Sequence, residues 1–222
     1  GDVYKRQVHT AILFSVVIGA VMTALGIGLA RPILVLLDPP ADTLEDSIVY
    51  LQWYFAGMIP SMVYNMGAGI LRAVGDSKRP LYFLIVCALA NTALDLLFVA
   101  GFRLGTAGAA IATGLSQCVG GVLPLIYFLR PNTSLLRLRP AALRLRPILQ
   151  SCGNGSSELM SNISSSLVGM LYNFQLMRLI GEDGVSAYGV LMYVQFIFVA
   201  IFIGYSIGSA PVVSFHYGAQ HH

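Results

Sequence analysis

Long stretches without a charged residue constrain the fold of this chain more than any other feature. Four stretches contain no Asp, Glu, Lys or Arg: residues 7–30, 47–71, 104–129 and 184–222. Each reaches the roughly 20 apolar residues that a helix needs to cross a lipid bilayer. Two further stretches, 80–102 and 147–177, contain one acid each, Asp95 and Glu158. The sequence therefore predicts an all-α membrane protein with six transmembrane helices.

Composition excludes the other broad classes of protein. Charged residues make up only 10% of the chain and hydrophobic residues 56%, with a mean hydropathy of +0.75. Soluble domains carry roughly 25% charged residues, and so apolar a chain does not stay disordered. The basic residues are spread between apolar stretches and have no aromatic residues interleaved for base stacking, so nucleic acid is not an expected partner. The expected surroundings are the lipid bilayer.

The charges of the connections predict an orientation. Basic residues cluster before the first span, at 72–79 and at 130–146, whereas acids cluster at 38–46 and 182–183. Lys and Arg near span ends are retained in the cytoplasm. We therefore expect a multi-pass protein of the cell membrane with both termini of this chain cytoplasmic. The opening residues, GDVYKRQ, lack an initiating Met and are interpreted as something other than a native start.

The connection RPNTSLLRLRPAALRLRP, at 130–147, is the longest and is typical of a linker between two halves. Its three prolines prevent a continuous helix. Its Leu and Arg residues are suited to lying against anionic lipid headgroups.

Polar residues inside the spans are the candidates for function, because a mid-bilayer charge costs roughly 2.5 to 3.5 kcal/mol. Asn91 and Asp95 lie four residues apart and therefore share a helix face. Thr113 lies at a similar depth in the next span. Such oxygen ligands suit a small cation, or a proton held by the carboxylate. The alternative is structural: a protonated Asp95 bonds across helices, as Asn and Thr often do in membrane bundles.

A second polar set lies in the fifth span. Glu158 and Asn162 stand within GNGSSELMSNISSS, a stretch too polar to face lipid tails, and Asn173 continues the polarity beyond it. This span is predicted to line a cavity for substrate or a second cation. A tight helix interface is the alternative reading.

Four segments together closely resemble the multidrug and toxic compound extrusion (MATE) family. They are ILRAVGDSKRP before the third span, NTALD within it, GTAGAAIAT opening the fourth, and GSAPVVSFHYGA near the end. Their order, spacing and predicted sidedness agree with the family from about Val8 to the C-terminus. The resemblance implies part of a twelve-helix, two-lobe transporter, of which this chain is a fragment covering helices three to eight.

The resemblance also implies lobes and site residues. Residues 1–130 correspond to the last four helices of the N-lobe, 131–147 to a cytoplasmic linker, and 148–222 to the first two helices of the C-lobe. The family's N-lobe cation site uses an Asn, an Asp and a Thr that match Asn91, Asp95 and Thr113. Its fourth ligand, an Asp of the first helix, has no counterpart here, and the remaining helices of the parent chain are expected partners. Glu158 matches an acid of the C-lobe cavity, although Asn154 stands where the family usually has Pro.

The function implied by this resemblance is antiport. Amphipathic, possibly cationic, small molecules would leave the cell in exchange for Na⁺ or H⁺, with no other cofactor or metal. A lipid-linked sugar flippase of the same superfamily is the first alternative, but it would call for basic residues within the spans. A membrane-embedded enzyme ranks lower, because it needs convergent catalytic groups and Asp95 and Glu158 lie at different depths, so we expect no enzyme activity. An ion channel is a further, lower-ranked alternative.

Overall fold

The computed structural model describes residues 2–37, 41–131, 136–138, 140 and 142–219. All the regular secondary structure in these ranges is helical, which confirms the predicted all-α class. The chain divides into two compact units, Gly1–Arg144 and Leu145–His222. Each unit is described by itself.

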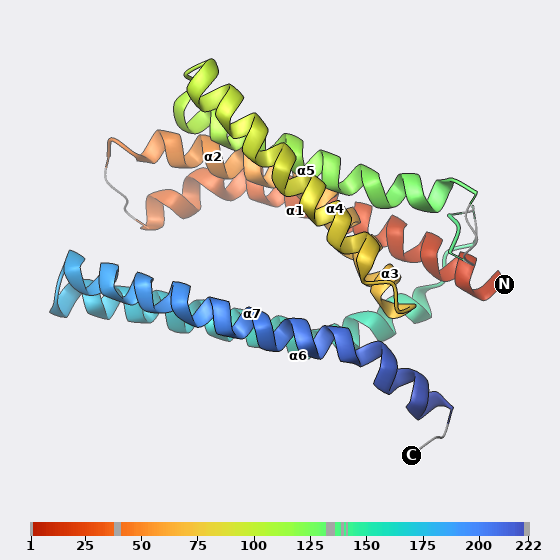
Figure 1. Ribbon diagram of the computed structural model, residues 1–222. Coiled ribbons are helices and arrows are strands. Elements are labelled where there is room, and N and C mark those ends of the chain that lie inside the picture. Colours follow the sequence, from red (N-terminus) through yellow and green to blue (C-terminus); the bar gives the residue numbers. More distant parts are fainter. Residues whose placement is uncertain (1, 38–40, 132–135, 139, 141, 220–222) are drawn as a thin grey trace. The chain divides into compact units, whose positions relative to one another are not determined.

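Among the described residues, unit 1 contains five α-helices and one π-helical segment, and unit 2 contains a pair of helices; Figure 1 shows their arrangement within each unit. The elements of unit 1 are α1 (Asp2–Leu37), α2 (Leu44–Ala56), α3 (Met58–Ala73), α4 (Lys78–Asp95), the π-helix η1 (Leu96–Gly101) and α5 (Gly105–Leu129). Those of unit 2 are α6 (Leu145–Leu179) and α7 (Glu182–Gly218). Within the described residues, four segments are long and apolar enough to cross a membrane, namely Lys5–Leu37, Lys78–Gly101, Gly105–Leu129 and Glu182–Gly218.

The other two predicted spans differ from a simple apolar helix. The span expected at 47–71 is divided at Gly57 into α2 and α3, so neither piece is long enough alone. The span expected at 147–177 lies within α6, which is long but polar because of its Ser, Asn and Gly residues. Polarity of this kind does not prevent a helix, since each backbone group is bonded within the helix itself.

Two neighbouring helices contact the chain at the break around Gly57. The Gly57 N–H donates to the carbonyls of Trp53 and Tyr54, at 3.3 and 3.2 Å. From α1, the Thr23 hydroxyl donates to the carbonyl of Phe55 at 2.8 Å. From α5, the amide oxygen of Gln117 lies 1.9 Å from where a Cβ on Gly57 would stand. A side chain at this position would require the flexible end of Gln117 to move.

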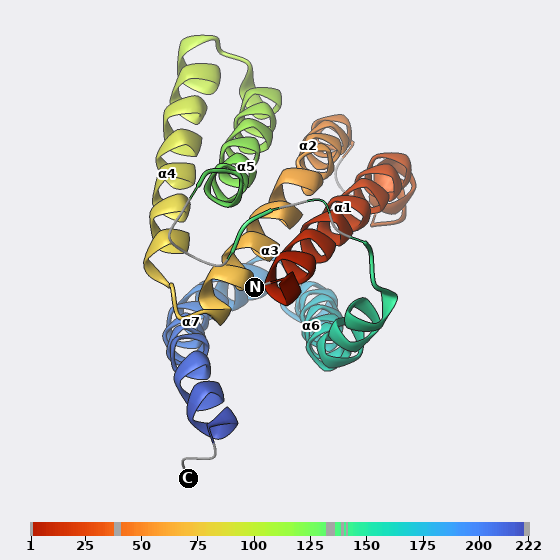
Figure 2. The ribbon, with the colours of Figure 1, turned by 90° about the vertical axis from the view of Figure 1, so that its right-hand side faces the viewer.

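Small residues let α5 approach its neighbours closely. A Cβ on Gly121 would lie 2.6 Å from the carbonyl oxygen of Pro60 in α3, and one on Gly67 would lie 2.6 Å from the Cβ of Pro124. Figure 2 shows α5 alongside α4, in the same unit as α3. Such contacts are the usual role of small residues in membrane helices.

The buried core of unit 1 includes a residue from the predicted linker. Leu136 is 4% exposed and belongs to one cluster with Val8, Ile12, Leu71 and Phe128. The N–H of Leu138 donates to the carbonyl of Phe128 at 3.0 Å. This part of the linker is therefore anchored in the core of unit 1.

In unit 2, α6 and α7 form an antiparallel pair joined by a tight turn. Gly181 adopts a φ of +84° there, a conformation that glycine accepts without a side-chain penalty. Next to the turn, the rings of Tyr172 and Tyr188 stack at 5.6 Å with an interplanar angle of 8°. No residue of α6 is buried among those described.

Candidate functional site

The predicted cation ligands of α4 lie on the face that packs against α5. The Cys87 thiol donates to the carbonyl of Ser116 in α5 at 3.1 Å. Asn91 and Asp95 follow Cys87 at intervals of four residues, so all three share one face of the helix. Both Asn91 and Asp95 are half-buried. The α4–α5 interface therefore carries an amide and a carboxylate in successive turns.

Two contacts fix the register of α4 and η1 against α5. They show which residues of α4 lie opposite Thr113 along the helix axes. The first is the bond between Cys87 and Ser116. The second is the backbone of Phe98, whose carbonyl oxygen lies 3.0 Å from where a Cβ on Gly108 would stand. Counting along the antiparallel helices from either contact places Thr113 level with residues 90–93. Along the helix axes, Thr113 therefore lies level with Asn91 and within about one turn of Asp95.

The Asp95 carboxylate has a buried oxygen without a partner. Its Oδ1 atom is inaccessible and accepts no hydrogen bond in the described structure, a condition shared only by Oε1 of Gln117. Most buried polar atoms in folded proteins find a partner, so each exception calls for an explanation. A bound cation or proton would satisfy this oxygen.

The helix changes its winding directly after Asp95. Regular α-helix ends at that residue and the π-helix η1 begins at Leu96. Short π-helical segments occur frequently at functional sites. Nothing in the composition of LLFVAG predicted this change.

The Thr113 hydroxyl bonds within its own helix rather than to Asp95. It donates to the carbonyl of Ala109 at 2.9 Å. The lone pairs of that hydroxyl still can accept or coordinate. No direct hydrogen bond between Asn91, Asp95 and Thr113 occurs in the described structure. The three residues share only the α4–α5 interface and a similar position along the helix axes.

The charge environment of Asp95 is simple. The described ion pairs are Arg31 with Glu45 and Arg79 with Asp76, and Asp95 belongs to neither. Among the described residues, no group of three or more His, Cys, Asp and Glu side chains converges as a transition metal would require.

The structure brings together two of the three predicted residues of α6. The side-chain amide of Asn162 donates to the carbonyl of Glu158 at 2.8 Å and to its carboxylate at 3.4 Å. Glu158 also shares a helix face with Tyr172, fourteen residues further on, which stacks against α7. Asn173 is turned by about 100° from Tyr172 and lies off that face.

Sequence reasoning missed Gln117, the second buried acceptor without a partner. It lies in a stretch with no charged residue, and a search for charges inside spans passes over an amide. Its position four residues after Thr113 was a usable signal, because that spacing places both on one face of α5.

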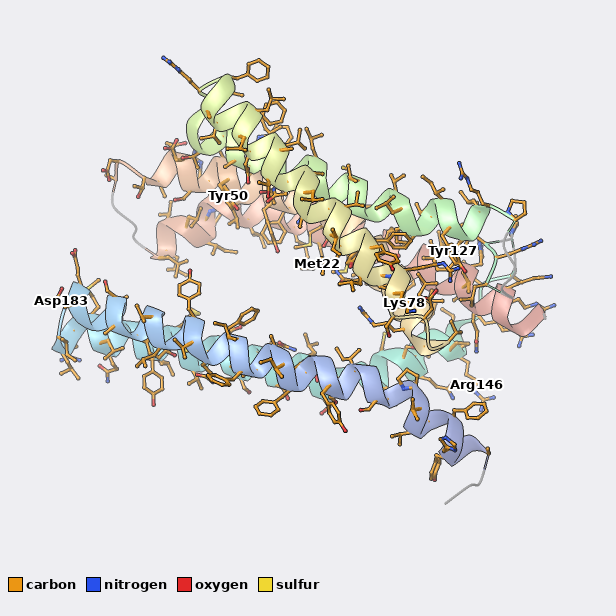
Figure 3. The ribbon with its side chains drawn as sticks, viewed as in Figure 1. Met22, Tyr50, Lys78, Tyr127, Arg146 and Asp183 are labelled. Carbon is orange, nitrogen blue, oxygen red and sulfur yellow. The ribbon has the colours of Figure 1, made fainter. Side chains whose placement is uncertain are left out.

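A polar cluster at the opposite end of α4 explains part of the ILRAVGDSKRP segment. Asp76 accepts a hydrogen bond from the backbone N–H of Arg79 at 3.2 Å and pairs with its guanidinium group. That guanidinium lies 4.8 Å from the ring centre of Tyr127 in α5. Figure 3 labels Lys78 and Tyr127 at this end of the unit. Burial alone would raise the pKa of Asp76, but the hydrogen bonds and charge of Arg79 outweigh it and lower that pKa.

Comparison with known proteins gives consistent matches. The family model MatE matches residues 2–97 and 158–222. The probable multidrug resistance protein YpnP of Bacillus subtilis (strain 168) is 39% identical over 107 residues, which are 48% of this chain and 24% of that protein. The probable multidrug resistance protein YoeA of the same strain is 29% identical, over 94% of this chain and 48% of that protein.

A solved structure matches the fold over the same extent. A crystal structure of MATE in the bent conformation has a TM-score of 0.87 at 20% identity and covers 98% of this chain and 49% of that one. The chain thus spans at most about half the length of the relatives and the structure that it matches.

Proposed function

Because the chain belongs to the MATE family, we propose that it acts as part of a multidrug exporter driven by a cation gradient. The exported compounds are amphipathic and often cationic, and the coupling ion is Na⁺ or H⁺. Residues 1–130 and 148–222 contribute to the N-lobe and the C-lobe, with 131–147 as the linker between them. The coupling ion binds at Asp95, with Asn91 and Thr113 as neutral oxygen ligands.

One observation carries the assignment of Asp95. Its Oδ1 atom is buried and unpartnered, on the helix face that packs against α5 and within about one turn of the height of Thr113. A carboxylate kept only for packing would gain by bonding a neighbour, because an unpaired buried polar group costs free energy. A carboxylate that alternately binds and releases an ion must instead keep an oxygen free of protein donors.

The distribution of basic residues favours export of a neutral or cationic compound over flipping of a lipid-linked sugar. A pyrophosphate would require basic side chains within the membrane. In the described helices, Lys and Arg lie near helix ends, and Arg31 is already paired with Glu45 by bonds of 3.0 and 2.9 Å. The membrane interior of this chain therefore offers carboxylate and amide groups but no anion-binding cation.

The test is Asp95→Asn in a full-length transporter that carries this sequence. The amide keeps nearly the same shape and removes the charge, so folding and membrane insertion should be preserved while ion-driven ethidium efflux falls at least tenfold. Asp42→Asn, a matched change in an exposed turn, should leave efflux unchanged. If Asp95→Asn retains the full response to a Na⁺ or pH gradient, the coupling role moves to Glu158, whose Gln variant is then the next measurement.

The proposed orientation places the termini of this chain in the cytoplasm. It is supported by the basic connections at one set of helix ends and the acidic ones at the other. In a chain whose three native cysteines are replaced by Ser, a cysteine at Asp183 should react with an impermeant maleimide from outside intact cells. A cysteine at Arg144, exposed in the structure, should react only after the membrane is opened. The reverse pattern contradicts the orientation.

A further inference from the structure

The π-helix η1 has no evident cause in its own sequence. Its six residues, LLFVAG, contain no proline and no side chain that can form a hydrogen bond. The backbone nevertheless follows the wide pattern, because the N–H of Phe102 donates to the carbonyl of Leu97, five residues earlier, at 2.9 Å. Contacts that favour this winding are found in the α4–α5 turn and in the first turns of α5.

The start of α5 contacts the backbone in the middle of η1. The carbonyl oxygen of Phe98 accepts a hydrogen bond from the N–H of Leu104 at 3.0 Å. The same oxygen lies 3.0 Å from where a Cβ on Gly108 would stand, and the Phe98 carbonyl carbon lies 3.1 Å from it. Both distances are shorter than most contacts of a real Cβ. Gly108, which is buried, therefore lets α5 approach η1 directly.

The turn between η1 and α5 uses a backbone conformation that is unusual for its residues. Among the described residues, Arg103 is the only one besides glycine with a positive φ, +54°, and Gly105 has a φ of +59°. These left-handed residues flank Leu104, whose N–H reaches back six residues to the carbonyl of Phe98. The Arg103 side chain is exposed. Its conformation is therefore part of the backbone closure of η1, and a side chain at this position can be changed without loss of packing.

The winding of η1 affects how Asp95 meets α5. A π-helix of this length holds about one residue more than an α-helix, which turns the residues on its two sides by about 100° relative to each other. Asp95 is the last α-helical residue before the change. It lies three residues from the contact at Phe98 and eight from the bond between Cys87 and Ser116. A return to α-helical winding would therefore turn Asp95 relative to Thr113 or break one of these two contacts.

We propose that the α4–α5 turn positions the coupling carboxylate. Gly108 and the left-handed backbone at Arg103 hold η1 in its π-helical winding, and this winding directs Asp95 toward α5. Neither residue touches the ion, so both are positioning residues. The inference rests on the proposed function, in which Asp95 binds the coupling ion. A misdirected carboxylate binds the ion more weakly, whereas a saturating ion concentration still fills the site and allows transport.

The first experiment compares Arg103→Val with Arg103→Asn in a full-length transporter that carries this sequence. Both changes remove the same exposed charge, but Asn tolerates a positive φ and the β-branched Val does not. Ethidium efflux from proteoliposomes is measured against the concentration of the driving ion, with Na⁺ at constant pH and with H⁺ in the absence of Na⁺. Arg103→Val should raise the concentration for half-maximal efflux about fivefold and change the maximal rate less than twofold. Arg103→Asn should change neither quantity.

The second experiment approaches η1 from α5. Gly108→Ala places a methyl group against the Phe98 carbonyl, which must then move by a few tenths of an ångström. It should raise the half-saturating ion concentration as Arg103→Val does. Gly114→Ala is the matched control in the same helix, because its Cβ would lie 3.7 Å from the carbonyl oxygen of Trp53, an ordinary contact. It should leave the half-saturating concentration unchanged.

Two results would overturn the proposal. Equal half-saturation in Arg103→Val and Arg103→Asn shows that the backbone conformation plays no part, and this pair decides alone if Gly108→Ala does not fold. A lower maximal rate in Gly108→Ala with unchanged half-saturation shows a role in packing only.

Asp95→Asn, measured in parallel, separates this inference from the proposed function. Loss of the ion response in Asp95→Asn together with a normal Arg103→Val overturns the positioning role alone. A full ion response in Asp95→Asn overturns the coupling site, and the positioning role with it.

Discussion

Glycine-rich helices occur in both units, and they behave differently in each. In α5 of unit 1, glycines meet neighbouring helices so closely that an added Cβ on Gly121 would lie within 2.6 Å of the backbone of Pro60. In α6 of unit 2, Gly153, Gly155 and Gly169 have nothing within 4 Å of such a Cβ. A small-residue pattern therefore creates close packing only where another helix meets it.

The same contrast extends to burial. Unit 1 buries large side chains such as Leu71 and Phe128, at 0% and 1% exposure. Unit 2 consists of one helix pair, and two antiparallel helices cannot surround a residue on all sides. Its aromatic contact between Tyr172 and Tyr188 lies at the turn end. Unit 1 thus holds its own core, whereas α6 and α7 present most of their surface to whatever surrounds them.

The largest expected effect comes from adding a side chain to one glycine in each unit. Gly121→Leu must displace the backbone of α3. We expect it to lower the free energy of unfolding by more than about 3 kcal/mol, because overpacking costs about 1 to 3 kcal/mol and occasionally more. Gly169→Leu should change stability by less than about 1 kcal/mol, since leucine is the better helix former. Fluorescence-detected size-exclusion after heating compares the two midpoints. Equal midpoints would show that the two units pack alike.

An intermediate effect is expected where the linker enters the core of unit 1. Leu136→Ala should cost about 2 to 3 kcal/mol of stability, the lower part of the range of about 2 to 5 kcal/mol for truncating a buried leucine. Release of the linker should also speed tryptic cleavage after Arg137. Leu143→Ala, at a position 56% exposed, is the matched control and should change neither quantity. Cleavage at the same rate in both variants would mean that Leu136 does not hold the linker.

The smallest effect concerns the ion pair at the α3–α4 connection. Because Arg79 lowers the pKa of Asp76 in the folded chain, the pair contributes stability at neutral pH and loses it as the pH falls through that lowered pKa. Asp76→Asn should therefore cost under about 1 kcal/mol at pH 7, since the pair is partly exposed. The difference from the unmodified chain should vanish in acid. Thermal midpoints measured between pH 3 and 7, with Asp42→Asn as control, check this, and a pH-independent difference would exclude the pair as its cause.

The sequence predicted the fold class and much of the candidate site for a specific reason. Long uncharged stretches predict transmembrane helices because a bilayer offers no hydrogen bonds to an exposed backbone. The spacing of Asn91 and Asp95 reports a shared face because helical periodicity is fixed. The pairing of Asn162 with Glu158 follows from the same periodicity. The roles of these four residues in ion coupling and substrate binding stay predictions.

Other features depended on contacts between segments distant in the sequence. Near Gly57, where one span is divided, Thr23 and Gln117 meet the chain from other helices. The burial of Leu136 depends on Val8 and Phe128, at the two ends of unit 1's chain. A pattern within one segment does not predict contacts between segments that lie far apart in the sequence.

The sequence by itself determined that this chain is a helical membrane protein, where most of its spans begin and end, and which polar residues lie within them. These properties follow from hydropathy and helical periodicity, which act over a few turns. Only the tertiary structure decided that Asp95 keeps an unpartnered oxygen against α5, that a π-helix follows it, and that Glu45 is paired with Arg31. Those outcomes depend on which side chains from other helices reach each position, and that is settled when the helices pack.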